Sequence, residues 1–250
     1  VWAVPMAALV MLAWGRWGEI SALFRDWRLV RMMMLTAALI AANWGIYVYS
    51  IAANITSQAA LGYYITPLMN VALGTLLLGE RMTKLQTAAV AIAAVAVLVK
   101  AVWAGEVPYI GLALTTSFAV YGYLRKTVPV GATPGFLMEV VLLAPFALAY
   151  LLWVAVQGQA AFGTDLTLTA LLIGCGPVTA IPLILYAVGA RGLRLTTLGL
   201  MQYIAPTLIF IVSFTVFGEE FTRVEAVTFA LIWTALALYS WSMLRGNGTT

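Results

Sequence analysis

The chain has 250 residues, of which 64% are hydrophobic and 9% are charged, with a formal net charge of +4 and a mean hydropathy of +1.01. Soluble domains carry about 25% charged residues, so this composition excludes a water-soluble globule and predicts a membrane protein. The sequence has no histidine and one cysteine, Cys175, which excludes histidine-based zinc sites and an internal disulfide. We therefore expect no cofactor and no metal site.

Nine apolar runs follow one another along the chain, and a helix of about 20 apolar residues crosses a bilayer. They lie near 2–15, 31–53, 58–79, 85–103, 108–124, 134–156, 167–190, 195–218 and 223–244. Continuous runs are typical of helices rather than of barrel strands, in which polar and apolar residues alternate. The sequence predicts an all-α membrane protein with nine transmembrane helices, joined by connections too short to hold a soluble domain.

The basic residues predict how the helices are oriented in the membrane. If the connections alternate between the two sides, eleven lysines and arginines fall on one side and two, Lys100 and Arg223, on the other. This asymmetry places the C-terminus in the cytoplasm. Because the basic residues lie singly at the ends of runs, we expect the lipid bilayer as a partner and no nucleic acid.

An internal repeat relates the two halves of the chain. At an offset of 139 residues, 61–83 matches 200–222 at seven of 23 positions, and Tyr47 matches Tyr186. The two copies end on opposite sides of the membrane, which is typical of the inverted repeats of secondary transporters. The second half holds five runs and the first half holds four. We therefore expect one further helix before Val1, and ten helices in the full-length protein.

Four stretches of sequence carry a resemblance to a known family. They are Leu61–Leu68 with Leu78–Arg81, Gly122–Lys126, Thr179–Leu183 and Leu198–Thr207. Together they resemble RarD proteins, which are EamA-type members of the drug/metabolite transporter superfamily. The resemblance implies a ten-helix permease of the bacterial inner membrane, named for chloramphenicol sensitivity or resistance. It also implies that 1–104 is a first EamA repeat lacking one helix, 107–245 a second repeat of five helices, and 246–250 a C-terminal tail.

Polar side chains within the runs are candidates for a substrate cavity. Asn43, Tyr47 and Asn54 share one helical face, and Tyr63, Pro67 and Asn70 share another. The expected cavity residues are Asn43, Tyr47, Tyr63, Tyr64, Asn70, Tyr186, Gln202 and Tyr203. A lining without fixed charge suits small amphipathic solutes that are neutral or zwitterionic. Alternatively, the amides are hydrogen bonds between helices and the tyrosines form an interfacial belt.

Glu139 is the one acid well inside an apolar run. A charged group at the centre of a membrane costs about 2.5–3.5 kcal/mol on insertion scales, so its presence needs a reason. One interpretation is a cavity acid that carries a proton and couples its movement to transport. The other is an acid that reaches the cytoplasmic interface and pairs with Arg125 or Lys126.

Two prolines, one helix end and two arginines are interpreted from their positions relative to the apolar runs. Pro67 and Pro206 occupy equivalent places in the repeat and predict paired helix kinks near the binding region. Gly79 with Glu80 is typical of a helix stop followed by a surface acid. Arg191 and Arg194 are interpreted as cytoplasmic anchors, or otherwise as attractors of an anionic substrate.

These features predict a secondary-active permease or exporter of small drugs or metabolites that works by alternating access. An enzyme is not expected, because the sequence offers no nucleophile with a base to activate it. The alternative is a membrane scaffold or sensor that transports nothing. A homo-oligomeric assembly remains open from the sequence.

Overall fold

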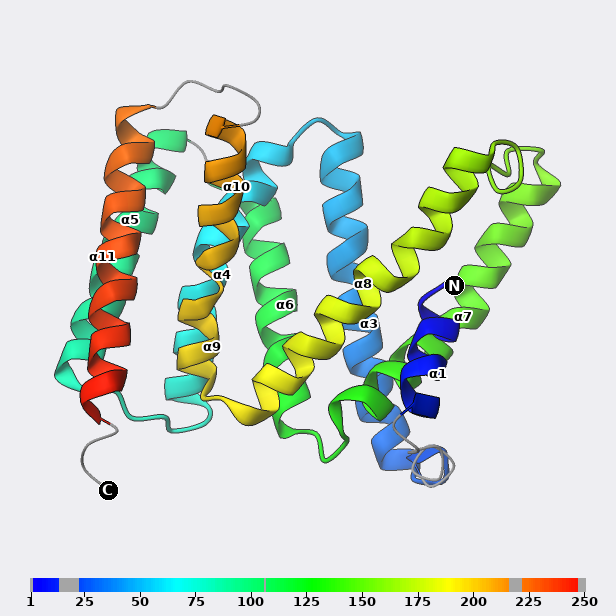
Figure 1. Cartoon of the computed structure of the whole chain (residues 1–250), viewed down its shortest axis with the longest axis horizontal. Helices are drawn as coiled ribbons and strands as arrows, with labels where there is room; N and C mark the ends of the chain where they lie inside the picture. Colours follow the sequence, from blue (N-terminus) through cyan, green and yellow to red (C-terminus); the bar gives the residue numbers. More distant parts are fainter. Residues whose placement is uncertain (1, 14–22, 106, 216–221, 247–250) are drawn as a thin grey trace. The chain divides into compact units, whose positions relative to one another are not determined.

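A computed structural model describes residues 2–13, 23–105, 107–215 and 222–246 (Figure 1). Its helices are α1 (Ala3–Ala13), α3 (Trp27–Ala52), α4 (Thr56–Leu76), α5 (Lys84–Ala104), α6 (Tyr109–Thr127), α7 (Ala132–Val156), α8 (Leu166–Gly192), α9 (Leu195–Met201), α10 (Ile204–Thr215) and α11 (Arg223–Gly246). Of these described helices, α3, α5, α7, α8 and α11 are long and apolar enough to cross a membrane. The predicted all-α fold is confirmed for the described residues.

The run at 195–218, expected to be one helix, contains two helical segments separated by a two-residue turn, at which Gln202 keeps a right-handed helical conformation and its N–H also donates to Leu198 O at 3.3 Å. The helix α9 ends at Met201, and α10 begins at Ile204. In between, the N–H of Gln202 donates to Gly199 O (3.0 Å) and the N–H of Tyr203 to Leu200 O (3.1 Å), which tightens the chain into a turn. Pro206 therefore lies in the first turn of α10, where its missing N–H costs little, whereas Pro67 lies inside α4. Residues 216–218 lie outside the described residues.

The end of α3 also differs from the expectation. The helix ends at Ala52, and Asn54 has a φ of 57°, a left-handed conformation that asparagine tolerates better than most residues. Asn54 therefore does not continue the helical face of Asn43 and Tyr47, as the spacing had predicted.

Two compact units divide the chain. The first unit comprises Val1–Ala41 and Leu124–Gly192, and the second comprises Ala42–Tyr123 and Leu193–Thr250. Each unit takes helices from both halves of the sequence. This division by packing is of a different kind from the division into repeats at 1–104 and 107–245, which stays a prediction.

Each unit has a core of small and aliphatic side chains. In the first unit, residues of α1, α7 and α8 pack together: Ala7, Met11, Phe136, Leu137, Ala180 and Ile184. In the second unit, alanines on one face of α5 pack against Ile232, Ala235 and Tyr239 of α11. Small residues allow two helices to approach closely, which is how helices associate where lipid is as apolar as their side chains.

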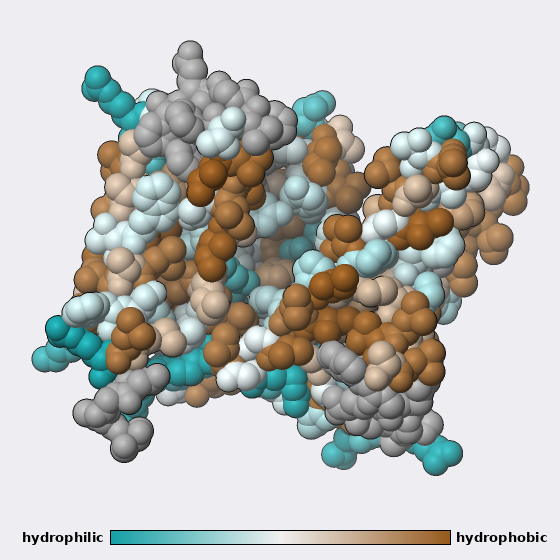
Figure 2. All heavy atoms as spheres, viewed as in Figure 1, coloured by the Kyte–Doolittle hydropathy of each residue, from teal (hydrophilic) through white to brown (hydrophobic). Residues whose placement is uncertain are grey.

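Large apolar side chains also lie on the outside of the helices. Val178 of α8 is 74% exposed, and Leu208 of α10 is 56% exposed. Figure 2 shows hydrophobic residues along the visible sides of α8 and α10. A water-soluble protein rarely exposes such continuous apolar surface, whereas a membrane protein presents it to lipid.

The crossing of α4 and α6 in the second unit depends on two glycines. A Cβ at Gly111 would lie 2.5 Å from Gln58 O and 2.8 Å from Gly62 N. The hydroxyls of Thr66 and Thr115 both donate to Gly62 O, at 2.8 and 2.9 Å. The two backbones can therefore approach only where neither helix carries a side chain.

We predict that Gly111→Val lowers the thermal unfolding midpoint of the protein in detergent. Overpacking of this kind costs about 1–3 kcal/mol, because the added side chain forces α6 away from α4. Gly45→Ala is the control, since a Cβ at Gly45 meets no atom within 4 Å. An unchanged midpoint for Gly111→Val would contradict a close contact between these helices.

Candidate transport site

The helix break between α9 and α10 lies against α4 in the second unit. The Nδ2 of Asn70 donates to the Oε1 of Gln202 at 2.6 Å, and Gln202 directly follows the last residue of α9. Asn70 is fully buried, and its Oδ1 has no hydrogen-bond partner among the described residues. Two predicted cavity residues from opposite halves of the sequence are therefore in direct contact.

A glycine allows this part of α9 to approach α4. A Cβ at Gly199 would lie 2.6 Å from Pro67 O and 2.9 Å from the Cβ of Asn70. Any other residue at 199 would push the two helices apart and separate the amides of Asn70 and Gln202. Position 199 thus needs glycine for space, and no unusual backbone angle is involved.

Two of the predicted tyrosines are joined across the same helices. Tyr203 is fully buried, and its hydroxyl donates to the backbone carbonyl of Tyr64 at 3.2 Å. The ring centroids of Tyr64 and Phe229 lie 6.1 Å apart, and the Lys100 ammonium lies 6.0 Å from the centroid of the Tyr64 ring. Lys100 pairs with Glu225 at 3.4 Å. Asn70, Tyr64, Gln202 and Tyr203 thus form one cluster.

Tyr47, Tyr63 and Asn43 also belong to the second unit. The rings of Tyr47 and Tyr63 meet edge to face, with centroids 6.3 Å apart. The Nδ2 of Asn43 donates to Leu114 O at 2.8 Å and to Ser117 Oγ at 2.9 Å, which joins α3 to α6. These contacts of Asn43 are hydrogen bonds between helices, the alternative that the sequence had left open, and its place in a cavity stays a prediction.

Tyr186 and Glu139 belong to the first unit, on α8 and α7. Glu139 is almost fully buried, and its Oε1 lies 3.7 Å from the Nε of Arg125. Arg125 is fully buried too, and its Nη2 donates to Ala132 O at 2.7 Å. A Cβ at Gly135 would overlap the guanidinium, so glycine is what allows Arg125 to lie beside α7. The pairing of Glu139 with Arg125 was one of the two alternatives predicted.

The arginines near the end of α8 have structural partners. In the first unit, the Nη1 of Arg191 donates to Val128 O (2.9 Å) and Val130 O (2.6 Å), which fixes the connection between α6 and α7. In the second unit, Arg194 donates to Arg81 O and lies 4.0 Å from the Oε2 of Glu80. These contacts join segments of the chain to one another, and the interpretation of both arginines as cytoplasmic anchors stays a prediction.

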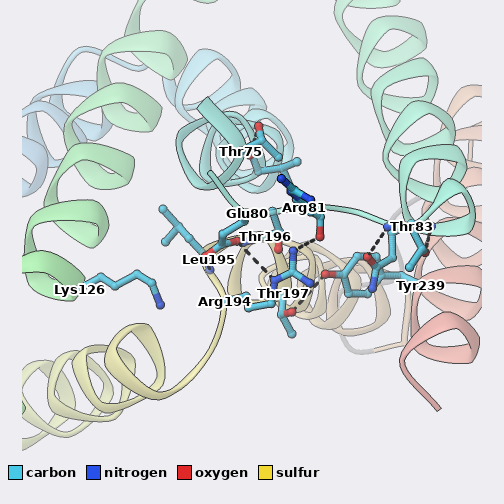
Figure 3. A network of polar contacts seen from close by, with 12 residues as sticks. Thr75, Glu80, Arg81, Thr83, Lys126, Arg194, Leu195, Thr196, Thr197 and Tyr239 are labelled. Carbon is cyan, nitrogen blue, oxygen red and sulfur yellow. Dashed lines mark hydrogen bonds and ion pairs between the residues drawn. The ribbon is translucent and has the colours of Figure 1, made fainter. Parts of the chain in front are cut away.

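Glu80 is a residue whose role the sequence analysis missed. It was interpreted as a surface acid, but its carboxylate accepts hydrogen bonds from the N–H groups of Leu195 (2.6 Å) and Thr196 (2.9 Å) at the start of α9 (Figure 3). The partners are 115 and 116 residues away in sequence, so no local pattern around Glu80 reveals them. Within the described residues, no group of three His, Cys, Asp or Glu side chains could hold a metal ion.

Curated proteins with similar sequences are bacterial transporters. An uncharacterized transporter of Vibrio cholerae is 42% identical over 99% of this chain and 82% of its own length. The protein RarD of Streptomyces exfoliatus is 39% identical over 98% of this chain and 78% of its own. The chloramphenicol-sensitive protein RarD of Pseudomonas aeruginosa is 33% identical over 98% of this chain and 83% of its own.

A solved structure shares the fold. One crystal structure, whose description names no function, superposes on this chain with a TM-score of 0.70 at 18% sequence identity. The superposition covers 96% of this chain and 84% of the chain in the crystal structure. No protein-family model matches the chain. The relatives are transporters rather than enzymes, as predicted, and transport implies a small-molecule substrate and a membrane. The resemblance noted in the sequence is thus confirmed, and the chain belongs to the RarD family of multi-pass membrane transporters.

Proposed function

We propose that the chain is a secondary-active permease or exporter that moves small drugs or metabolites across the bacterial inner membrane by alternating access. The observation that carries this proposal is the break between α9 and α10, which lies against Pro67 and Asn70 of α4. Secondary transporters typically bind their substrates at interrupted helices, where polar groups are released from regular hydrogen bonding.

The proposed topology is nine spans in two inverted EamA repeats, 1–104 and 107–245, followed by the tail 246–250 with the C-terminus in the cytoplasm. The charge asymmetry of the connections supports the orientation. The repeat at an offset of 139 residues supports the inversion. The described helices coincide with the nine apolar runs, except that one run contains both α9 and α10.

The proposed substrate cavity is lined by amides and phenols without a fixed charge. Its residues in the second unit are Asn43, Tyr47, Tyr63, Tyr64, Asn70, Gln202 and Tyr203, and Tyr186 of the first unit is proposed by itself as a further residue that contacts the substrate. The buried Oδ1 of Asn70 can accept a hydrogen bond from a hydroxyl or amide N–H of a solute. Chloramphenicol is the first solute to test, because a RarD relative is named for sensitivity to it.

The proposed coupling group is Glu139, with a proton as the coupling ion. Its carboxylate is almost fully buried beside Arg125. Breaking a buried ion pair by removing one partner costs about 3–5 kcal/mol, whereas replacing both partners costs far less. A change in the charge of Glu139 therefore alters the stability of the contact between α6 and α7. Protonation of Glu139 can in this way change how the two helices pack.

We predict that Asn70→Ala and Gln202→Ala each slow chloramphenicol transport about tenfold, because losing a hydrogen bond to the solute costs about 1.4 kcal/mol. The measurement is uptake into proteoliposomes that contain the full protein. Thr234→Ala is the control, since its exposed hydroxyl donates only to Ala230 O of its own helix. Wild-type rates in both variants would exclude this cavity. Wild-type protein that moves no drug, amino acid or metabolite, with or without a pH gradient, would favour a scaffold or sensor.

We predict that Glu139→Gln removes the acceleration of transport by a pH gradient. Because this variant leaves Arg125 buried without a carboxylate, it is compared with the double variant Arg125→Gln/Glu139→Gln, in which neither charge remains. The double variant should recover the amount of folded protein in the membrane, yet its transport should stay independent of the gradient. Recovery of the gradient dependence in the double variant would show that the pair is only structural.

A further inference from the structure

Glu80 caps a helix that is too short to be stable alone. The helix α9 has seven residues, and its first six are all buried. The first four N–H groups of any helix lack partners within it, and isolated helices of this length do not form in water. Two of these N–H groups, those of Leu195 and Thr196, donate to the Glu80 carboxylate, whose negative charge also favours the positive end of the helix dipole.

The end of α4 places this carboxylate accurately. Gly79 has a φ of 63°, and the N–H of Glu80 donates back to Gly74 O at 3.0 Å, which turns the chain sharply after the helix. Gly74 leaves the space that the carboxylate occupies, since a Cβ there would lie 2.8 Å from the Oε2 of Glu80 and 3.2 Å from the N of Thr196. Figure 3 shows Glu80 beside Leu195 and Thr196 in this arrangement.

The opposite end of α9 is held by the same helix. Gln202 follows the last residue of α9 and accepts the hydrogen bond of Asn70, while Gly199 packs on Pro67. Along its side, α9 is also joined to α11, by a hydrogen bond between Thr197 Oγ1 and the hydroxyl of Tyr239 at 3.1 Å. α4 and the residues that directly follow it thus hold α9 at both ends.

We propose that Glu80 is a positioning residue for the amide pair of Asn70 and Gln202. By capping α9 at its start, it fixes where the helix ends, and so where Gln202 presents its amide to Asn70 and to a solute. The proposal rests on the function proposed above, because it concerns the same pair. The Glu80 carboxylate accepts hydrogen bonds from the backbone of α9, and it is through α9 that we infer its effect on the amide pair.

Arg194 supplies a matched control. Its side chain is 43% exposed and lies 4.0 Å from the Glu80 carboxylate, so water screens most of this attraction. Arg194→Gln removes that charge and the hydrogen bond to Arg81 O but leaves in place both hydrogen bonds from the backbone of α9 to Glu80. Glu80→Gln keeps the size of the side chain but replaces one acceptor oxygen by an NH₂ group, which cannot accept the second bond.

The test is hydrogen–deuterium exchange over residues 195–203 of the full chain in lipid nanodiscs. Glu80→Gln should speed exchange at Leu195 and Thr196 and also at Gln202 and Tyr203, by about tenfold, as expected for the loss of a hydrogen bond to a charged group. Arg194→Gln should leave all four rates within about twofold of the wild type, because an exposed ion pair contributes little. Faster exchange confined to Leu195 and Thr196 would overturn the proposal and leave Glu80 as a local cap.

Transport supplies the second measurement. Glu80→Gln should slow chloramphenicol uptake about tenfold at concentrations below the KM, as predicted for Asn70→Ala, through a raised KM at a maximal rate close to the wild type. If Glu80→Gln does not accumulate, Glu80→Asp replaces it, because the shorter side chain keeps the charge but cannot reach both N–H groups. Wild-type exchange at Gln202 and Tyr203 in Glu80→Asp would also overturn the proposal. If Asn70→Ala and Gln202→Ala do not affect transport, the proposed cavity fails, while exchange in the Glu80 variants still decides whether this residue positions α9.

Discussion

The hydrocarbon core of a bilayer offers no hydrogen bonds, so the protein itself must satisfy every polar group that its helices bury. At several places in the described structure, side chains complete the hydrogen bonds that regular helices leave open. Glu80 accepts from the first N–H groups of α9, and Arg191 donates to two carbonyls of the connection between α6 and α7. Thr66 and Thr115 share the carbonyl of Gly62 at the crossing of α4 and α6. At the turn between α9 and α10, by contrast, the N–H groups of Gln202 and Tyr203 donate to carbonyls of α9 itself.

The same requirement governs the charges. Glu139 looks solitary in its apolar run, but in the structure it lies beside the equally buried Arg125, which also donates to a backbone carbonyl. Lys100 and Glu225 pair at the side of an aromatic cluster, with both side chains partly exposed. The first pair is far from water and is sensitive to any loss of charge, whereas the second is partly screened. Among the described residues, Arg125 and Glu139 are thus a buried pair in which each charge depends on the other.

The apolar runs could be recognised from the sequence because the length and hydropathy of a local stretch are enough to identify a membrane helix. The pairing of Asn70 with Gln202 was foreseen only as membership of one cavity, and the resemblance of the two halves was what brought the two residues together. The break at Gln202 could not be foreseen, since Leu195 to Thr215 is apolar enough for one helix and Pro206 fits either a kink or a first turn. The role of Glu80 was missed for another reason. Its partners are distant in sequence, and they are backbone N–H groups, which almost every residue has and which no sequence pattern marks.

The distance in sequence between partners also decides when each contact can form during synthesis. Arg125 and Glu139 lie on consecutive helices, so their pair can close as soon as this hairpin has entered the membrane. The hydrogen bonds of Glu80 can form only after more than a hundred further residues, including those of α9, have been synthesised. Because chains emerge from the ribosome N-terminus first, at about 5–20 residues per second, this acid spends several seconds without its final partners. Until the last three helices are in place, the carboxylate at the end of α4 therefore needs temporary hydrogen-bond partners. Water at the membrane surface or the insertion machinery can supply them.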